Sequence, residues 1–348
     1  PALLRGAVAR ELDAVAEAYG TPRRTLLMNA APPKPRATKG AVDLQIADAP
    51  TTVVLSTTGR AVRVDLGEGQ ELTAPARRSK HDAILATVET TVRGEVGALT
   101  STGRVVRFSP VDLPSVPGTS VQLAAGTPLR DYLGITTKGE RILGFVRFDS
   151  ETPVALGTAQ GIVKRIMPST LPVRPDLEVI GLKAGDAVVG AADAADDADL
   201  VFLTTDAQLL RFSASTVRPQ GAPAGGMAGI KLGSGASVLF FGAVRPDTDA
   251  VVATVSGAES ILPGTDPGRA KVSAFTEYPS KGRATGGVRA HAFLKGEDRL
   301  TVAWVGPSPA LAVDPTGAVR KLPDVGARRD ASGQPIDGVI GSIGRTLV

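Results

Sequence analysis

The chain has 348 residues, two histidines and no cysteine, and its formal net charge is +4. The absence of cysteine excludes disulfides and thiolate metal sites and suits a reducing cytoplasm. No run of apolar residues approaches the eighteen that a membrane helix needs, and no charged-then-apolar leader opens the sequence. We therefore expect a soluble protein with no membrane partner, large enough for one closed β domain or two ordinary domains.

The first forty residues predict one helix followed by a basic linker. Apolar residues recur at helical spacing over residues 2–19, at Leu4, Val8, Leu12 and Val15. Gly20 is placed to end this helix. Residues 30–40 are rich in proline and carry only positive charges, which is typical of an extended linker. Because the sequence starts at Pro1 without an initiator methionine, we expect a piece of a longer protein whose globular part begins near Ala41.

One hairpin frame recurs along the rest of the chain. Residues 51–64 consist of an apolar strand, a small-residue turn with glycine, and a second strand that carries arginines. Further copies lie at residues 96–108, 154–165, 206–212 (the turn and second strand), 251–272 and 311–321. Successive turns are about 44 to 60 residues apart, as expected for units of four strands. The pattern predicts an all-β fold, a propeller-like ring of six four-stranded blades over residues 41–348, preceded by a short N-terminal helix.

A second signature follows the hairpins. It is a Gly/Pro/basic loop that leads into a short apolar segment and often a Leu-x-x-Gly-Asp-like turn, as in residues 180–186, 229–233 and 288–298. We expect these segments to supply the other two strands of each unit.

The most repeated polar feature is a set of cations that flank the hairpin turns. They are Arg60, Arg63, Arg104, Arg107, Lys164, Arg165, Arg211, Arg269, Lys271, Arg320 and Lys321. In a ring of repeated blades, equivalent cations form a band, and such a band suits a curved polyanion whose phosphate oxygens bind the guanidinium groups. Exposed hairpins also carry lysine or arginine for solubility and edge protection. Repetition in every hairpin favours nucleic acid over this alternative.

The Thr-x-Gly-Arg-x-Val-Arg hairpins and the helix end at Tyr19-Gly20 and Arg23-Arg24-Thr25 together resemble a known domain. It is the C-terminal domain of the A subunit of bacterial type IIA topoisomerases, gyrase and topoisomerase IV. The resemblance matches residues 1–29 to the tail helix of the breakage-reunion domain and residues 41–348 to the β-pinwheel, with 30–40 as the linker. In that family neighbouring blades exchange strands, and the basic perimeter wraps or bends DNA. The resemblance implies binding and bending of duplex DNA without sequence specificity, which sets the topological substrate preference of the enzyme.

Two basic loops are compared with a motif of that family. Gyrase carries a Gln-Arg-Arg-Gly-Gly-Lys-Gly box in its first blade, and residues 75–81 stand at the matching position without the glycines that let a backbone approach phosphate. Residues 281–289 are a second partial match. The cations of the two loops are Arg77, Arg78 and Lys80, and Lys281, Arg283 and Arg289. Ordinary basic turns are the alternative for both. The departures from the box favour a topoisomerase IV type of chain or a divergent gyrase type.

The sequence gives no pattern for catalysis. Tyr19 ends the predicted helix, and Tyr132 and Tyr278 have no adjacent arginine, so we expect all three to pack rather than to cleave DNA. The aspartates of residues 193–199 lack the glycine and glutamate of a calcium loop and predict a solvated turn. We expect no catalytic residue, metal or cofactor in this chain. The resemblance implies that the parent is an ATP-dependent isomerase, with its cleavage tyrosine in the preceding domain and with ATP and Mg on other domains or subunits.

The expected partner is duplex DNA. The resemblance adds the rest of the A subunit, the ATPase B subunit of an A2B2 enzyme, and a cytoplasmic, nucleoid-associated location. A protein-interaction propeller with incidental cations is the main alternative. A hydrolytic propeller enzyme is a third, against which the shortage of histidine and of convergent carboxylates weighs.

Overall fold

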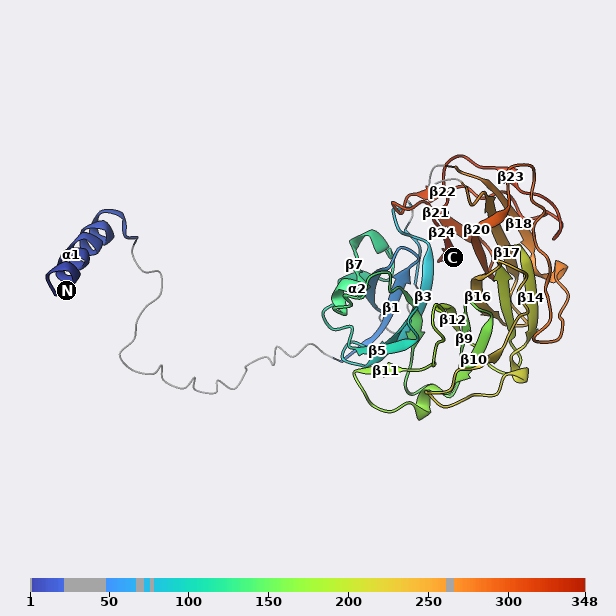
Figure 1. Cartoon of the computed structure of the whole chain (residues 1–348), viewed down its shortest axis with the longest axis horizontal. Coiled ribbons are helices and arrows are strands. Elements are labelled where there is room, and N and C mark those ends of the chain that lie inside the picture. Colours follow the sequence, from blue (N-terminus) through green and yellow to red (C-terminus); the bar gives the residue numbers. More distant parts are fainter. Residues whose placement is uncertain (1, 22–47, 67–71, 76–77, 261–265, 348) are drawn as a thin grey trace. The chain divides into compact units, whose positions relative to one another are not determined.

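A computed structural model describes residues 2–21, 48–66, 72–75, 78–260 and 266–347. The chain divides into two units, residues 1–45 and 46–348. In the first unit, helix α1 runs from Ala2 to Tyr19 (Figure 1), over the residues that the apolar spacing predicts. The amide of Gly20 donates to the carbonyl of Ala16 at 2.8 Å and ends the helix. None of the described helices is long and apolar enough to cross a membrane. The predicted linker, residues 30–40, lies outside the described residues.

The second unit is built from antiparallel hairpins. In the described residues these are β1 (Pro50–Ser56) with β2 (Arg60–Asp65), β4 (Val96–Thr100) with β5 (Arg104–Phe108), β9 (Val154–Thr158) with β10 (Ile162–Ile166), β13 (Asp199–Thr204) with β14 (Gln208–Ser213), β17 (Ala250–Gly257) with β18 (Arg269–Ala274), and β21 (Ala310–Val313) with β22 (Val319–Arg320). Every hairpin predicted from the repeated frame is therefore confirmed.

The repeated frame has a local cause in the turns. A residue with φ between +59° and +85° stands at the tip of each, namely Gly59, Gly103, Gly161, Ala207, Gly268 and Gly317. Glycine suits this left-handed conformation because it has no Cβ. A side-chain oxygen before the tip clamps several turns: Ser56 Oγ accepts the amide of Arg60 at 2.9 Å, and Thr204 Oγ1 accepts that of Gln208 at 3.0 Å. The Ser or Thr three residues before the tip therefore helps to encode the turn itself.

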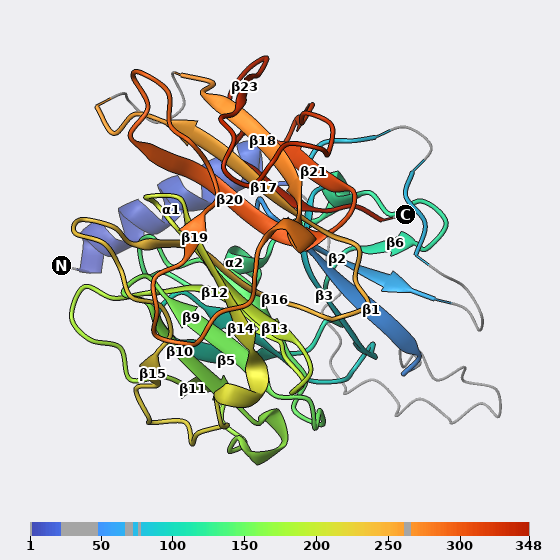
Figure 2. The same cartoon turned by 90° about the vertical axis from the view of Figure 1, so that its right-hand side faces the viewer.

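A third strand joins the first strand of each hairpin. These strands are β3 (Ile84–Thr91), β8 (Ile142–Val146), β12 (Val188–Asp193), β16 (Val238–Val244), β20 (Arg299–Pro307) and β24 (Ser342–Arg345). Figure 2 shows one such group, with β17 between β20 and β18. The third strands contact one another in chain order, and β24 returns to β3 through the pair Arg345 and Ile84. The groups of strands that contain the first and last hairpins thus meet in one sheet, with β24 and β3 between the two hairpins (Figure 1).

The outer strand of a sheet comes from beyond the next hairpin. Strand β11 (Asp176–Glu178) follows β10 in the chain but pairs with β5. The same shift places β6 (Ser115–Pro117) and β7 (Thr127–Pro128) on β2, β15 (Met227–Ala228) on β10, β19 (Val288–Arg289) on β14, and β23 (Gln334–Pro335) on β18. Neighbouring sheets therefore exchange a strand, as the resemblance implies.

Apolar side chains fill the space between successive sheets. Phe202 of β13 and Phe241 of β16, which are partners within one sheet with ring centroids 4.7 Å apart, cluster with Val163 of β10 in the preceding sheet. Helix α2 (Leu129–Tyr132) and short 3-10 turns at Leu123–Ala125, Pro168–Thr170, Ala214–Thr216 and Phe275–Glu277 lie in the connections. The all-β fold is confirmed. By hydrogen bonding the described strands form four sheets of four and one of eight, which holds the first and last hairpins, so the count of six blades stays a prediction.

Candidate nucleic-acid interface

Two of the predicted DNA contacts, Lys164 and Arg165 of β10, are buried, with exposed fractions of 0% and 1%. Lys164 Nζ lies 2.7–2.8 Å from four carbonyl oxygens, those of Val179, Gly221, Ala222 and Ala224. The Arg165 guanidinium donates to the carbonyls of Ala194, Ala214 and Val217 and pairs with Asp196 at 2.7 Å. Their prediction as phosphate contacts is therefore wrong, because later loops of the chain cover β10.

Arg63, Arg107 and Arg211 occupy the position of Arg165 in their own hairpins and are partly buried. Each pairs with a carboxylate: Asp65 at 3.0 Å, Glu95 at 3.0 Å and Asp199 at 3.6 Å, respectively. Two of them also cover rings, since the guanidinium carbon of Arg107 is 3.5 Å from the centroid of Phe148 and that of Arg211 is 4.7 Å from that of Phe275. These arginines hold neighbouring segments together, and their charge is largely balanced within the protein.

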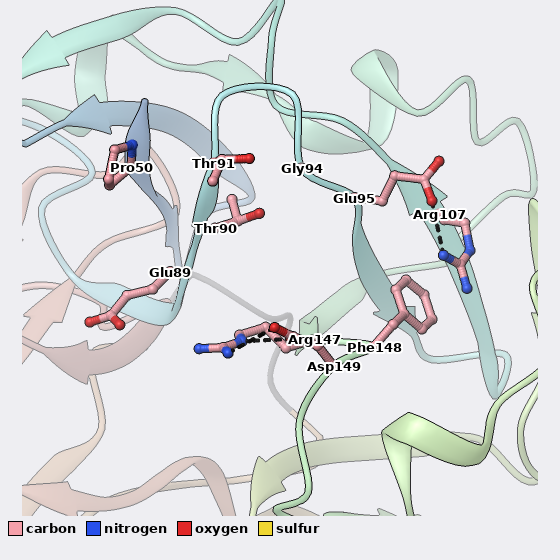
Figure 3. Close-up of a pocket in the computed structure, with 10 residues that line it drawn as sticks. All are labelled: Pro50, Glu89, Thr90, Thr91, Gly94, Glu95, Arg107, Arg147, Phe148 and Asp149. Atoms are coloured by element: carbon pink, nitrogen blue, oxygen red, sulfur yellow. Dashed lines mark hydrogen bonds and ion pairs between the residues drawn. The ribbon is translucent and has the colours of Figure 1, made fainter. Parts of the chain in front are cut away.

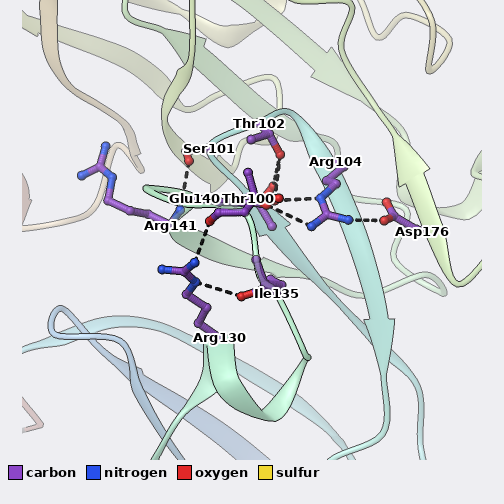
Figure 4. A network of polar contacts seen from close by, with 10 residues as sticks. Thr100, Ser101, Thr102, Arg104, Arg130, Ile135, Glu140, Arg141 and Asp176 are labelled. Carbon is purple, nitrogen blue, oxygen red and sulfur yellow. Dashed lines mark hydrogen bonds and ion pairs between the residues drawn. The ribbon is translucent and has the colours of Figure 1, made fainter.

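Arg104 is bound by two carboxylates (Figure 4). Its Nε and Nη2 donate to the two oxygens of Glu140 at 2.7 and 2.9 Å, and its Nη1 donates to Asp176. The Glu140 side chain is fully buried. Burial alone raises the pKa of Glu140, but hydrogen bonds from Arg104, Thr100 and Thr102 outweigh it and hold the pKa at about 2. Arg104 is thus a structural cation that two acids neutralise.

Arg60 and Arg320, the remaining hairpin arginines among the predicted contacts, also bind within the protein. Arg60 Nη1 donates to the carbonyl of Gly126 at 2.5 Å, and Arg320 Nη2 pairs with Asp314 at 2.7 Å. Both are partly exposed. They can therefore add positive charge to the surface, but each guanidinium is held by a contact within the protein.

The exposed cations of the predicted set lie mainly in the loops that lead to exchanged strands. Within the described residues Arg78, Lys80, Lys281, Arg289 and Lys321 are exposed and form no ion pair. Arg283 is half-buried and donates to the carbonyl of Ala228 at 2.5 Å. Arg77 lies outside the described residues. The candidate contacts are therefore fewer than the sequence suggests and lie farther from the hairpin turns.

Three successive loops bring cations together, and we call Lys231, Lys281, Arg283, Arg289, Arg328 and Arg329 the exchange-loop cations. The amide of Lys231 donates to the carbonyl of Thr285 at 3.0 Å, and Arg329 Nη1 donates to the carbonyl of Arg289 at 3.4 Å. The loops that carry these residues therefore touch in sequence around one side of the unit. Sequence reasoning missed Lys231, Arg328 and Arg329, although the repeated Gly/Pro/basic loop was the signal that could have found them.

The loop with Arg78 and Lys80 joins the first and last hairpins. The amide of His81 donates to the carbonyl of Gly317 at 2.7 Å, and His81 Nδ1 lies 2.9 Å from Thr58 Oγ1. Burial, and then the charges of Arg60 and Lys80, lower the pKa of His81. These contacts fix the two exposed cations next to the turn that precedes Lys321.

Two of the three tyrosines considered for catalysis are engaged in packing, whereas Tyr19, at the end of α1, is 82% exposed, so the prediction that it packs is not confirmed. Tyr278 is buried, its hydroxyl lies 2.8 Å from Ser273 Oγ, and burial raises its pKa to about 12. The hydroxyl of Tyr132 donates to the carbonyl of Ser109 at 2.7 Å. In the part of the chain that the structure describes, no group of three or more potential ligands could hold a metal ion.

A cleft of about 530 Å³ lies between β3, the following turn and the end of β8 (Figure 3). Its lining carboxylates include Glu95 and Asp149, which pair with Arg107 and Arg147 at 3.0 Å. Glu89 also lines the cleft. Its hydroxyl groups are those of Thr90 and Thr91, and no histidine, serine or cysteine lines it.

Comparison with known proteins gives a consistent relationship. A family model described as the DNA gyrase C-terminal domain, β-propeller, matches residues 198–245 and 262–302. The DNA gyrase A protein of Mycobacterium leprae is 29% identical over 303 residues, which are 83% of this chain and 22% of that protein. Its counterpart from Escherichia coli is 29% identical over 218 residues, 61% of this chain and 23% of that protein. The chain is similar to the gyrase A C-terminal domain.

Solved structures show the same fold for this gyrase-like chain. The C-terminal domain of DNA topoisomerase IV aligns with a TM-score of 0.66 at 19% identity, over 86% of this chain and 93% of that one. A DNA gyrase A C-terminal domain aligns with a TM-score of 0.57 at 15% identity, over 86% and 100%. The resemblance read from the hairpins and the helix end is therefore confirmed. The chain spans less than a quarter of the two gyrase proteins named above.

Proposed function

We propose that this gyrase-like domain is a six-bladed closed pinwheel that binds duplex DNA by its phosphates and bends it. The cyclic contacts of the third strands, β3 to β24 and back to β3, support the six-bladed ring. The exchange-loop cations carry the proposal for DNA, because they are contributed by three successive loops that touch one another. Arg78, Lys80 and Lys321 extend the proposed surface to the junction of the first and last hairpins.

The contacts are proposed to be independent of base sequence. Long cationic side chains on loops suit phosphate oxygens, which position a duplex without reading it. The relatives named above are gyrase proteins, and we propose the same setting here: the A component of a type IIA topoisomerase that works with an ATPase B component, in the cytoplasm and at the nucleoid. The departures from the gyrase box favour a topoisomerase IV-like or divergent gyrase activity for the whole enzyme. ATP and Mg would be bound by other parts of that enzyme.

The test is a pair of charge-matched variants of the full chain, Lys281→Ala with Arg289→Ala, and Arg5→Ala with Arg10→Ala on α1. Affinity for a mixed-sequence 40-base-pair duplex is measured across a salt series, together with bending by energy transfer between the duplex ends. Because each phosphate contact contributes about 0.9 to the slope of log affinity against log salt, the first variant should lower the slope by about 2 and reduce bending. The α1 variant should match the parent. Equal binding by both variants, or a parent with no salt dependence, would favour the protein-interaction scaffold instead.

A further inference from the structure

The buried ammonium of Lys164 holds a surface loop by its backbone. Three of its four carbonyl partners, Gly221, Ala222 and Ala224, belong to the loop of residues 220–226, which leads to the exchanged strand β15. An ammonium has three protons, so these short contacts occupy all of its donors. The loop is therefore fixed from beneath by a residue 57 positions or more earlier in the chain.

Peptide geometry fixes where the amides of this loop point. In a trans peptide the N–H is directed opposite to the carbonyl of the same unit. The carbonyls of Gly221 and Ala224 point to Lys164 Nζ, so the amides of Ala222 and Gly225 point away from it. Neither amide donates a hydrogen bond within the described residues. Gly225 is exposed and Ala222 is half-buried, so both donors are directed toward the surface.

The same device recurs two hairpins later. Lys271 stands three residues after its turn glycine, as Lys164 does, and is 1% exposed. Its Nζ donates to the carbonyls of Arg328, at 3.2 Å, and Arg329, in the equivalent loop. A repeated buried lysine under a repeated surface loop is a specific arrangement and not a single packing accident.

The charge of Lys164 lacks a counter-charge in the described structure. No carboxylate lies within ion-pairing distance of its Nζ there. Burial lowers its pKa to about 8, with Glu178 opposing this shift from a distance. Burying an unpaired cation costs free energy, and such a cation attracts an anion placed beyond the carbonyl groups that surround it. The outward amides of the loop supply hydrogen-bond donors at that place.

We propose that the loop of residues 220–226 is a phosphate-binding site made of main-chain amides, and that Lys164 is the positioning residue that aims them. This proposal rests on the proposed function, because it names one of the places where the domain would bind DNA phosphates. The loop itself contains no lysine or arginine. Lys164 touches no DNA and acts only through the loop.

The test uses the full chain and a mixed-sequence 40-base-pair duplex. Lys164→Met keeps the length and apolar stem of the side chain but removes the ammonium, and Arg5→Met on α1 is the control for loss of one positive charge. Lys164→Met should weaken binding about fivefold to tenfold, although the altered residue is buried, because the loop amides are no longer held toward the phosphate. Arg5→Met should leave the affinity unchanged. In the parent labelled with 15N-alanine and 15N-glycine, the amide signals of Ala222 and Gly225 should shift on adding the duplex.

The outcomes separate the two proposals. If the parent binds DNA and a folded Lys164→Met variant binds equally well, the positioning role is refuted while the proposed function stands. If the parent does not bind, the proposed function fails first. If Lys164→Met does not fold, the amide titration of the parent decides: unmoved Ala222 and Gly225 signals in saturated complex refute the site, and shifted signals support it.

Discussion

Arg104→Met tests whether the hairpin arginines are structural. The substitution leaves the buried carboxylate of Glu140 without its bidentate partner, whose two bonds are 2.7 and 2.9 Å long. The network lowers the pKa of Glu140 from 4.5 to about 2, which corresponds to about 3 kcal/mol of stability at neutral pH. Loss of one partner from a buried ion pair costs a similar amount. We therefore expect the free energy of unfolding to fall by about 3 kcal/mol.

The assay is urea unfolding followed by circular dichroism, at pH 7 and at a series of lower pH values. A carboxyl group with a depressed pKa contributes stability above its unfolded pKa and loses it as the pH falls. The difference between parent and variant should therefore shrink between pH 4.5 and 2. The double variant Arg104→Met with Glu140→Gln should lose less than the sum of the single losses, because the two side chains act as one unit. An unchanged stability with a salt slope for DNA lowered by about 1 would refute the reasoning and return Arg104 to the DNA surface.

Two further predictions concern the histidines and the ring junction. His291 is buried between Thr254 Oγ1, 2.9 Å from Nδ1, and the amide of Gly333, which donates to Nε2 at 3.2 Å. Burial, then Lys271 and Arg269, lower its pKa to about 4, so stability should fall as the pH falls from 6.5 to 4, by about 2 kcal/mol at pH 5. His291→Gln should remove this slope in urea unfolding at pH 5 and 7.5, with His81→Gln as the comparison, and an unaltered slope would contradict the assignment. Gly317→Ala should cost at least about 1 kcal/mol, because φ is +85° and the new Cβ would lie 2.2 Å from His81 Nδ1. Gly59→Ala, at the same φ with open space around it, is the control for backbone strain alone, and equal losses in thermal unfolding would argue against a packed junction at His81.

The hairpins could be predicted because their chemistry is local. A Ser or Thr that caps its own turn and a glycine at positive φ lie within five residues of each other, as Ser56 and Gly59 do. The exchanged strands could not, because β15 and β19 are two residues long and pair with hairpins far behind them in the chain. Nothing in two residues specifies such a partner.

The cations show the same limit at the site. Lys164 and Arg289 both follow turns or loops rich in glycine, and the sequence pattern predicts both as DNA contacts. Their difference is set by distant segments: the loop of residues 220–226 covers Lys164, whereas nothing described covers Arg289. Burial of a cation depends on what the rest of the chain places over it, and the alternation within one strand contains no such information.

Strand exchange has a consequence for how such a domain can gain or lose length. A sheet such as β20-β17-β18-β23 is completed by residues that follow the next hairpin, β21–β22. Ending the chain after residue 308 would therefore remove that hairpin and also strip β23 from the preceding sheet. The indivisible module is not a sheet but a stretch from the middle of one sheet to the middle of the next. An insertion or deletion in evolution leaves every sheet with its outer strand only when it begins and ends at equivalent points of two such stretches. The number of sheets therefore changes by adding or removing one whole stretch at a time.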